Sequence, residues 1–120
     1  MIASENSDRA SLLADLIGLR RPIAESLSQL RGFPWDSPEE LVTLTRADLS
    51  NLLRAYLKGV LEAAECERWA EAVSGRDDVA LDEDSSGLLG RILFEMSSPE
   101  LFEPISVQVA RGWLDRLGSV

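Results

Sequence analysis

The clearest helical pattern in the sequence runs from Thr45 to Val60 and reads Thr45-Arg46-Ala47-Asp48-Leu49-Ser50-Asn51-Leu52-Leu53-Arg54-Ala55-Tyr56-Leu57-Lys58-Gly59-Val60. Its apolar residues recur at the spacing of one face of an α-helix: Leu49, Leu52, Leu53, Tyr56, Leu57 and Val60. Thr45 and Asp48 form a variant capping box, with aspartate where glutamate is usual. Gly59 follows as a stop signal. The stretch therefore predicts an amphipathic helix over 46–58.

Further segments on both sides of this stretch show the same helical spacing, separated by glycine, proline or other turn residues. They cover residues 8–17, 21–31, 62–74, 87–97 and 107–117, and a short helical turn is expected near 37–40. The alternation of apolar and polar residues that marks a strand is almost absent, so we expect no strands. Short connections between amphipathic helices favour antiparallel packing. The predicted fold class is all-α, a single small helical bundle of about five to six helices.

The length and composition of the chain support one domain. A chain of 120 residues buries roughly two-thirds of the surface that its unfolded form exposes, and a hydrophobic fraction of 45% is typical of globular proteins. We therefore expect one helical domain over residues 1–120. Ser7 is expected to cap the first helix, which leaves 1–7 as a segment that could be disordered. Residues 75–86 are expected to form an exposed acidic loop.

The net charge of −9 is concentrated in one part of the sequence. Residues 62–84 contain nine acidic and two basic side chains, whereas the chain before and after them is close to neutral. An acidic protein repels phosphate groups, so we expect neither a nucleic acid nor an anionic membrane as partner. A protein partner with a basic surface is the expectation for a functional acidic segment. The alternative is a solvated surface that aids solubility.

The candidate partner-binding residues are seven acids and one tryptophan: Glu67, Glu71, Asp77, Asp78, Asp82, Glu83, Asp84 and Trp35. Trp35 stands between Pro34 and Asp36, and we expect it to be partly exposed. Trp69 and Trp113 fall on apolar helix faces and are expected in the core.

A fragment of the acidic segment has the spacing of a calcium-binding loop. Asp82, Asp84, Ser86 and Gly87 match the first, third, fifth and sixth positions of an EF-hand loop. The twelfth position, which should supply a bidentate glutamate, is Leu93. We therefore expect no metal site here.

Catalytic motifs are missing from the sequence. There is no histidine, which excludes Ser-His and Cys-His arrangements, and no phosphate-binding or dinucleotide-binding glycine motif is present. Cys66 lies on an apolar stripe and is expected in the core. Nothing singles out a catalytic carboxylate pair among 21 acids. We expect a protein without catalytic residues or a cofactor.

The location of the protein is expected to be cytoplasmic. One cysteine cannot form an intramolecular disulfide. No apolar run reaches the length needed to cross a bilayer, and the N-terminus lacks the basic and apolar regions of a signal peptide.

A resemblance to a known family is carried by the run Asp48-Leu49-Ser50-Asn51-Leu52-Leu53-Arg54-Ala55-Tyr56-Leu57-Lys58-Gly59-Val60-Leu61-Glu62-Ala63 and by the later Leu93-Phe94-Glu95. Over residues 46–96, this pattern resembles small bacterial toxin-immunity proteins of the colicin D immunity type. The resemblance implies a helical, acidic, non-catalytic inhibitor that masks the basic tRNA-binding site of a cognate ribonuclease. It transfers no individual inhibitory residue to this chain.

Two functions remain as hypotheses from the sequence. The first is a non-catalytic protein-binding module, either an immunity-like inhibitor or an adaptor, that engages a basic partner through its acidic surface. The alternative is a structural or oligomeric helical protein, possible as a homo-oligomer, with a hydrophobic contact surface. Leu101, Phe102 and Trp35 are the candidates for that surface, because they lie near prolines and outside the regular stripes.

Overall fold

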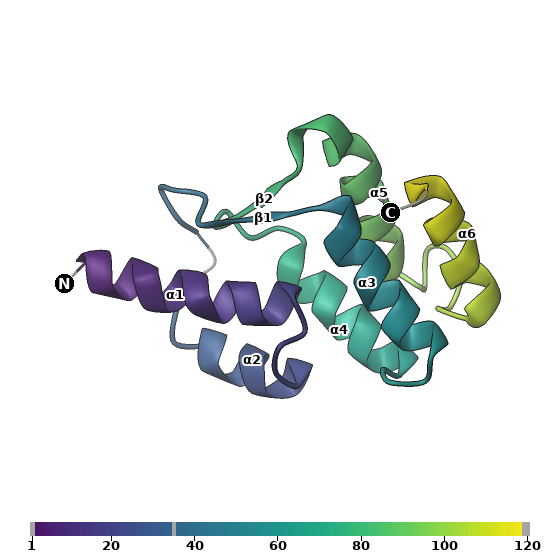
Figure 1. Ribbon diagram of the computed structural model, residues 1–120, viewed down its shortest axis with the longest axis horizontal. Helices are drawn as coiled ribbons and strands as arrows, with labels where there is room; N and C mark the ends of the chain where they lie inside the picture. The colour runs from purple at the N-terminus through teal and green to yellow at the C-terminus, as the bar shows by residue number, and fades with distance from the viewer. Residues whose placement is uncertain (1, 35, 119–120) are drawn as a thin grey trace.

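The computed structural model describes residues 2–34 and 36–118 of the chain. In chain order its elements are α1 (Ile2–Ile17), α2 (Ile23–Leu30), β1 (Val42–Leu44), α3 (Arg46–Leu57), α4 (Ala63–Val73), β2 (Val79–Leu81), a 3-10 turn η1 (Glu83–Ser85), α5 (Ser86–Ser97) and α6 (Val107–Leu117). Figure 1 shows α1 and α2 side by side at one end of the molecule and α6 at the other, with α3 and α4 between them. The predicted class, a small and mostly helical bundle, is confirmed.

Two helices begin at side chains that cap them, and the sequence predicts the first of these, Thr45. Thr45 Oγ1 accepts a hydrogen bond from Asp48 N at 3.1 Å, and Asp48 Oδ2 accepts one from Thr45 N at 3.0 Å, which completes the capping box of α3. Ser106 Oγ accepts a hydrogen bond from Val109 N at 3.2 Å at the start of α6. Each bond satisfies a backbone N–H that has no acceptor within its helix.

One residue of the predicted apolar stripe, Val60, lies beyond the end of α3. The helix ends at Leu57, and Gly59 adopts a φ of 81°, a conformation that favours glycine. Val60 lies beyond this turn and is 71% exposed. Val60 has the sequence spacing of the apolar stripe, but it does not share the helix face because the helix ends at Leu57.

Two further boundaries differ from expectation. Helix α1 begins at Ile2, so residues 2–7, which we expected before the helix, form its first turns, and Ser7 lies inside the helix instead of capping it. No helical turn forms at 37–40, where Ser37 Oγ instead accepts a hydrogen bond from Glu39 N at 3.2 Å.

A two-stranded parallel sheet contradicts the expectation that the chain has no strands. Val42 pairs with Val79, and Leu44 with Leu81. The pairing is parallel because α3 and α4 carry the chain back to the same end of the sheet. Each strand has only three residues, too few to show an alternating pattern. The segment 75–86 is therefore not a continuous loop, because it contains β2 and η1.

A single hydrophobic core connects the helices. Trp69 on α4 is fully buried, and its Nε1 donates to the carbonyl oxygen of Leu16 at 2.9 Å. Trp113 is 3% exposed, so both tryptophans predicted for the core are confirmed there. The other large, fully buried side chains are Leu13, Leu16, Ile23, Leu44, Leu49, Leu52, Leu53, Leu89, Ile92, Leu93 and Met96.

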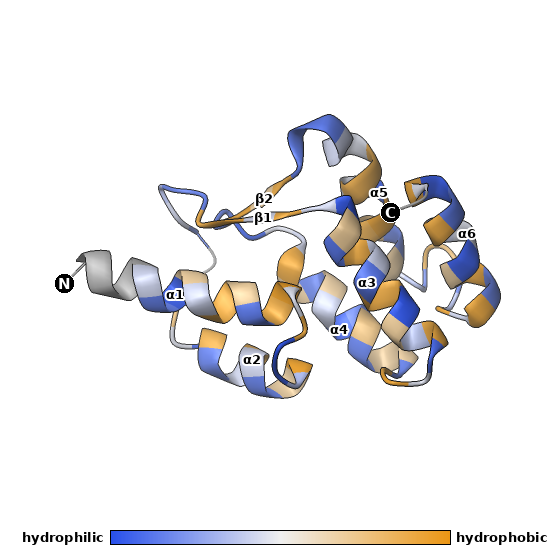
Figure 2. Cartoon of the chain, viewed as in Figure 1, coloured by the Kyte–Doolittle hydropathy of each residue, from blue (hydrophilic) through white to orange (hydrophobic). Residues whose placement is uncertain are grey.

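The distribution of hydropathy follows this core. In Figure 2 the short strand β2 is hydrophobic, whereas the turn that follows it, at the top of the view, is hydrophilic. Within the described residues, no helix is both long and apolar enough to cross a membrane.

Candidate protein-binding surface

Asp78 was expected on the acidic surface, and the structure shows that this prediction is wrong. Its side chain is fully buried. Arg9 Nε donates to Asp78 Oδ2 at 2.7 Å, and Arg76 Nε donates to Asp78 Oδ1 at 2.9 Å. The backbone carbonyl of Asp78 accepts from Leu41 N and Val42 N at 2.8 and 3.2 Å. Asp78 thus connects α1, the end of α4 and β1, and it is not accessible to a partner.

The two arginines explain why a carboxylate is tolerated at this buried position. Burial alone would raise the pKa of Asp78, but hydrogen bonds from Arg76 and Arg9, together with their positive charges, hold the pKa below its ordinary value. Arg9 also donates to the carbonyl oxygens of Pro34 and Asp36 at 2.7 and 2.9 Å. Trp35 itself lies outside the described residues, so its expected exposure stays a prediction.

Two of the predicted acidic residues lie close to a third acidic residue that was not among the candidates from the sequence. Glu67 and Glu71 lie one turn apart on α4, and Glu100 approaches them from the loop after α5. Partial burial raises the pKa of Glu67, and so do the negative charges of Glu71 and Glu100; Arg68 acts in the opposite direction. We call Glu67, Glu71 and Glu100 the α4 acidic cluster. Glu100 was missed because it lies in a part of the chain that is close to neutral.

The remaining acidic candidates do not belong to this cluster. Asp77 is exposed between α4 and β2. Asp82, Glu83 and Asp84 follow β2 and form a separate acidic turn at the top of Figure 1. The acidic stretch of the sequence is therefore divided by β2 and by the buried Asp78.

The calcium-like fragment does not form a loop of the expected kind. Asp82 precedes η1, Asp84 lies in η1, and Ser86 is already the first residue of α5. Leu93, at the position of the missing glutamate, is buried in the core. In the part of the chain that the structure describes, no group of three or more His, Cys, Asp or Glu side chains is placed to hold a metal ion.

Exposed apolar side chains gather at the connection between α5 and α6. Phe94, Leu101 and Phe102 are 45%, 65% and 38% exposed, and we call them the apolar patch. The rings of Phe94 and Phe102 meet edge to face with centroids 5.4 Å apart. Glu100, one member of the α4 acidic cluster, directly precedes Leu101 of this patch. Leu101 and Phe102 are candidates for a hydrophobic surface from the sequence, and both are exposed.

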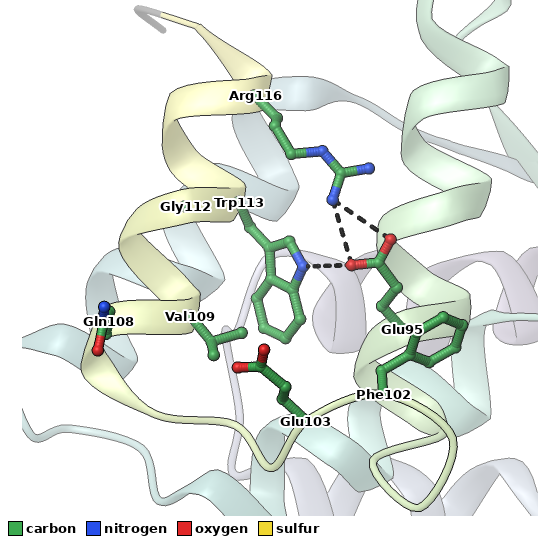
Figure 3. Close-up of a pocket in the computed structure, with 8 residues that line it drawn as sticks. All are labelled: Glu95, Phe102, Glu103, Gln108, Val109, Gly112, Trp113 and Arg116. Atoms are coloured by element: carbon green, nitrogen blue, oxygen red, sulfur yellow. Dashed lines mark hydrogen bonds and ion pairs between the residues drawn. The ribbon is translucent and has the colours of Figure 1, made fainter.

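A pocket with a volume of about 490 Å³ opens beside the apolar patch, between α6 and the loop after α5 (Figure 3). Glu95 Oε1 accepts hydrogen bonds from Trp113 Nε1 at 3.0 Å and from Arg116 Nη1 at 3.2 Å. Glu95 Oε2 accepts one from Arg91 Nε at 2.7 Å. Burial opposes ionisation of Glu95, but these donors hold its pKa below the ordinary value. They fix Glu95 as a structural carboxylate at the back of the pocket.

Cys66 is a core residue, as predicted, and its thiol should be unreactive in the folded protein. The side chain is fully buried, and burial, followed by the charge of Glu65, raises the pKa of the thiol to about 11. At neutral pH only about 10⁻⁴ of such a thiol is the reactive thiolate. We expect an aromatic disulfide reagent to label Cys66 slowly in the native protein and rapidly in denaturant. Equal labelling rates would contradict this prediction.

No known protein family, curated protein or solved structure was found to match this chain. The function is therefore inferred from the α4 acidic cluster, the apolar patch and the pocket beside them.

Proposed function

We propose that this protein is a non-catalytic protein-binding module, an immunity-like inhibitor or an adaptor, whose acidic surface engages a basic partner. The observation that carries the proposal is the α4 acidic cluster. Glu67, Glu71 and Glu100 come from two separate parts of the chain, and partial burial, followed by repulsion from Glu71 and Glu100, raises the pKa of Glu67. Keeping such charges together disfavours the folded state, whereas a basic partner would relieve the repulsion.

The neighbouring apolar patch supports the same proposal. Protein interfaces combine an apolar centre, rich in aromatic side chains, with a polar rim. Phe94, Leu101 and Phe102 provide such a centre, and Glu100 of the α4 acidic cluster, which directly precedes Leu101, provides a charged residue next to it. The partner surface that fits this arrangement carries basic residues around an apolar contact. The resemblance to immunity proteins of the colicin D immunity type also implies a basic partner.

Neutralising the α4 acidic cluster should weaken partner binding without harming the fold. The variant combines Glu67→Gln, Glu71→Gln and Glu100→Gln. A partner captured from a lysate of the native host at low salt should be retained at least about tenfold less well. The variant should be at least as stable as the wild type at neutral pH, because a raised pKa means that ionised Glu67 disfavours the folded state. Quantitative mass spectrometry of the captured protein and thermal unfolding provide the two measurements.

The separate acidic turn supplies a control with the same change in charge. Asp82→Asn, Glu83→Gln and Asp84→Asn also remove three negative charges, but from a turn outside the α4 acidic cluster. This control should retain the partner. Equal loss of the partner in both variants would show that net charge alone is responsible, and the proposed location would be wrong.

The exposed apolar patch favours a second candidate function, a homo-oligomer that buries this patch between copies. Leu101 is the most exposed member, at 65%. In this case Leu101→Asp should shift the protein from oligomer to monomer in sedimentation velocity, because a charge would be buried in the contact. A wild type that stays monomeric at high concentration would reject the oligomer and leave the patch to a different partner.

A further inference from the structure

The pocket beside the apolar patch combines an apolar wall with a carboxylate that has no partner among the described residues. Trp113 and Val109 line it, and a Cβ added at Gly112 would meet open space. Figure 3 shows the carboxylate of Glu103 turned toward Val109 and the ring of Trp113. Glu103 is exposed and makes neither a hydrogen bond nor an ion pair within residues 2–34 and 36–118.

The two arginines near the pocket, Arg91 and Arg116, are paired with the carboxylate of Glu95 and not with Glu103. Arg116 Nη1 lies 3.2 and 3.3 Å from the two oxygens of Glu95, and Arg91 Nε donates to Glu95 at 2.7 Å. Gln108, which also lines the pocket, is neutral. The charged side chains that line the pocket are two acids, Glu95 and Glu103, and one base, Arg116. The lining therefore carries a net negative charge, which favours a cation.

We infer that this pocket receives a lysine or arginine side chain of the partner, with its cation paired to Glu103. The methylene groups of such a side chain would lie against Phe102 and Val109, which line the pocket, since long basic side chains bury their stems on apolar surfaces. The rim already holds one cation beside an aromatic ring, because the guanidinium carbon of Arg91 lies 5.1 Å from the centroid of Phe102. The inference rests on the proposed function, because it gives the basic partner one specific residue to insert.

The test titrates three small probes into the isotope-labelled protein: the amides of Nα-acetyl-lysine, Nα-acetyl-arginine and Nα-acetyl-norleucine. The reporter is the NMR signal of the Trp113 indole N–H, which is assigned with Trp113→Phe. The two cationic probes should shift this signal to saturation, and norleucine, which has the methylene groups without the charge, should not. Glu103→Gln should weaken the binding of the cationic probes at least about tenfold. The control Glu83→Gln, which removes a charge from the separate acidic turn, should leave it unchanged.

A second variant blocks the pocket without removing a charge. Gly112→Leu places a side chain in the open space and favours the helix more than glycine does. It should abolish the lysine-amide shift in a protein that remains folded. The inference is overturned if norleucine amide binds as well as lysine amide, or if Glu103→Gln and Glu83→Gln behave alike. In that case, partner loss in the Glu67, Glu71 and Glu100 variant would still support the proposed function. Lysine-specific binding without that loss would support the pocket and overturn the proposed surface.

Discussion

Replacing Asp78 with alanine is expected to lower the free energy of unfolding by about 3–5 kcal/mol. The substitution removes the negative charge that compensates two buried guanidinium groups, those of Arg9 and Arg76, which are 7% and 6% exposed. Removing one member of a buried ion cluster lowers the free energy of unfolding by more than the intact cluster adds to it, because the charges left behind stay desolvated. Much of the fold is linked through this carboxylate, since it joins α1 to the start of β2. Urea unfolding followed by far-UV circular dichroism measures the change.

Asp77 is the matched control for this substitution. It is the same residue type, it is adjacent in sequence, and it is exposed. Asp77→Ala should change the free energy of unfolding by no more than about 0.5 kcal/mol. Similar losses for Asp77→Ala and Asp78→Ala would show that the buried cluster contributes little to stability.

The same cluster predicts a dependence of stability on pH. The pKa of Asp78 is lower in the folded protein than in the unfolded chain, where an aspartate titrates near about 3.9. Its stabilising contribution is therefore complete above that pH and is lost as the pH falls through the lower, folded pKa. The wild type should lose stability on acidification in this range, and Asp78→Asn should lose less. Parallel curves for the two proteins would contradict the assignment.

Replacing Trp69 with alanine is expected to lower the free energy of unfolding by about 3–5 kcal/mol, as much as the replacement of Asp78. Trp69 is fully buried on α4, and its indole N–H bonds the carbonyl oxygen of Leu16 at 2.9 Å. The substitution removes the largest fully buried side chain and leaves a cavity that the surrounding helices cannot fill without strain. Thermal and urea unfolding give the magnitude.

A conservative variant separates packing from hydrogen bonding at this position. Trp69→Phe keeps an aromatic ring but removes the indole donor to Leu16, so it should lower the free energy of unfolding by roughly 1–3 kcal/mol. A loss for Trp69→Ala no greater than that for Trp69→Phe would show that the ring contributes little to core packing.

The helices were predictable because their signals are local. The capping box of Thr45 and Asp48 involves residues three positions apart, and the buried faces repeat every three or four residues. Both features form within a single helix, so their physical cause is contained in a short stretch of sequence. The predicted positions of Cys66, Trp69 and Trp113 in the core depend on the same local spacing.

The candidate site was only partly predictable, because charge spacing does not say which acids face water. Asp77 and Asp78 are identical neighbours in the sequence, but one is exposed and the other is buried. Asp78 is held by Arg76, two residues away, and by Arg9, which lies 69 positions away along the chain and reaches Asp78 only after α1 has packed. Glu100 joins Glu67 and Glu71 for the same kind of reason, since only the packing of α4 and α5 brings the loop after α5 beside α4.

The main helices, the cap of α3 and most of the core were therefore predictable from the sequence, since these depend on residues within one or two helical turns. The remaining features depend on the tertiary fold. It paired two strands too short to be recognised, buried Asp78 between two arginines, and brought Glu100 to the α4 acidic cluster. It also placed Glu103 beside Trp113 in a pocket. Each of these results depends on contacts between distant segments, and hydrophobic packing of the helices is what brings those segments together.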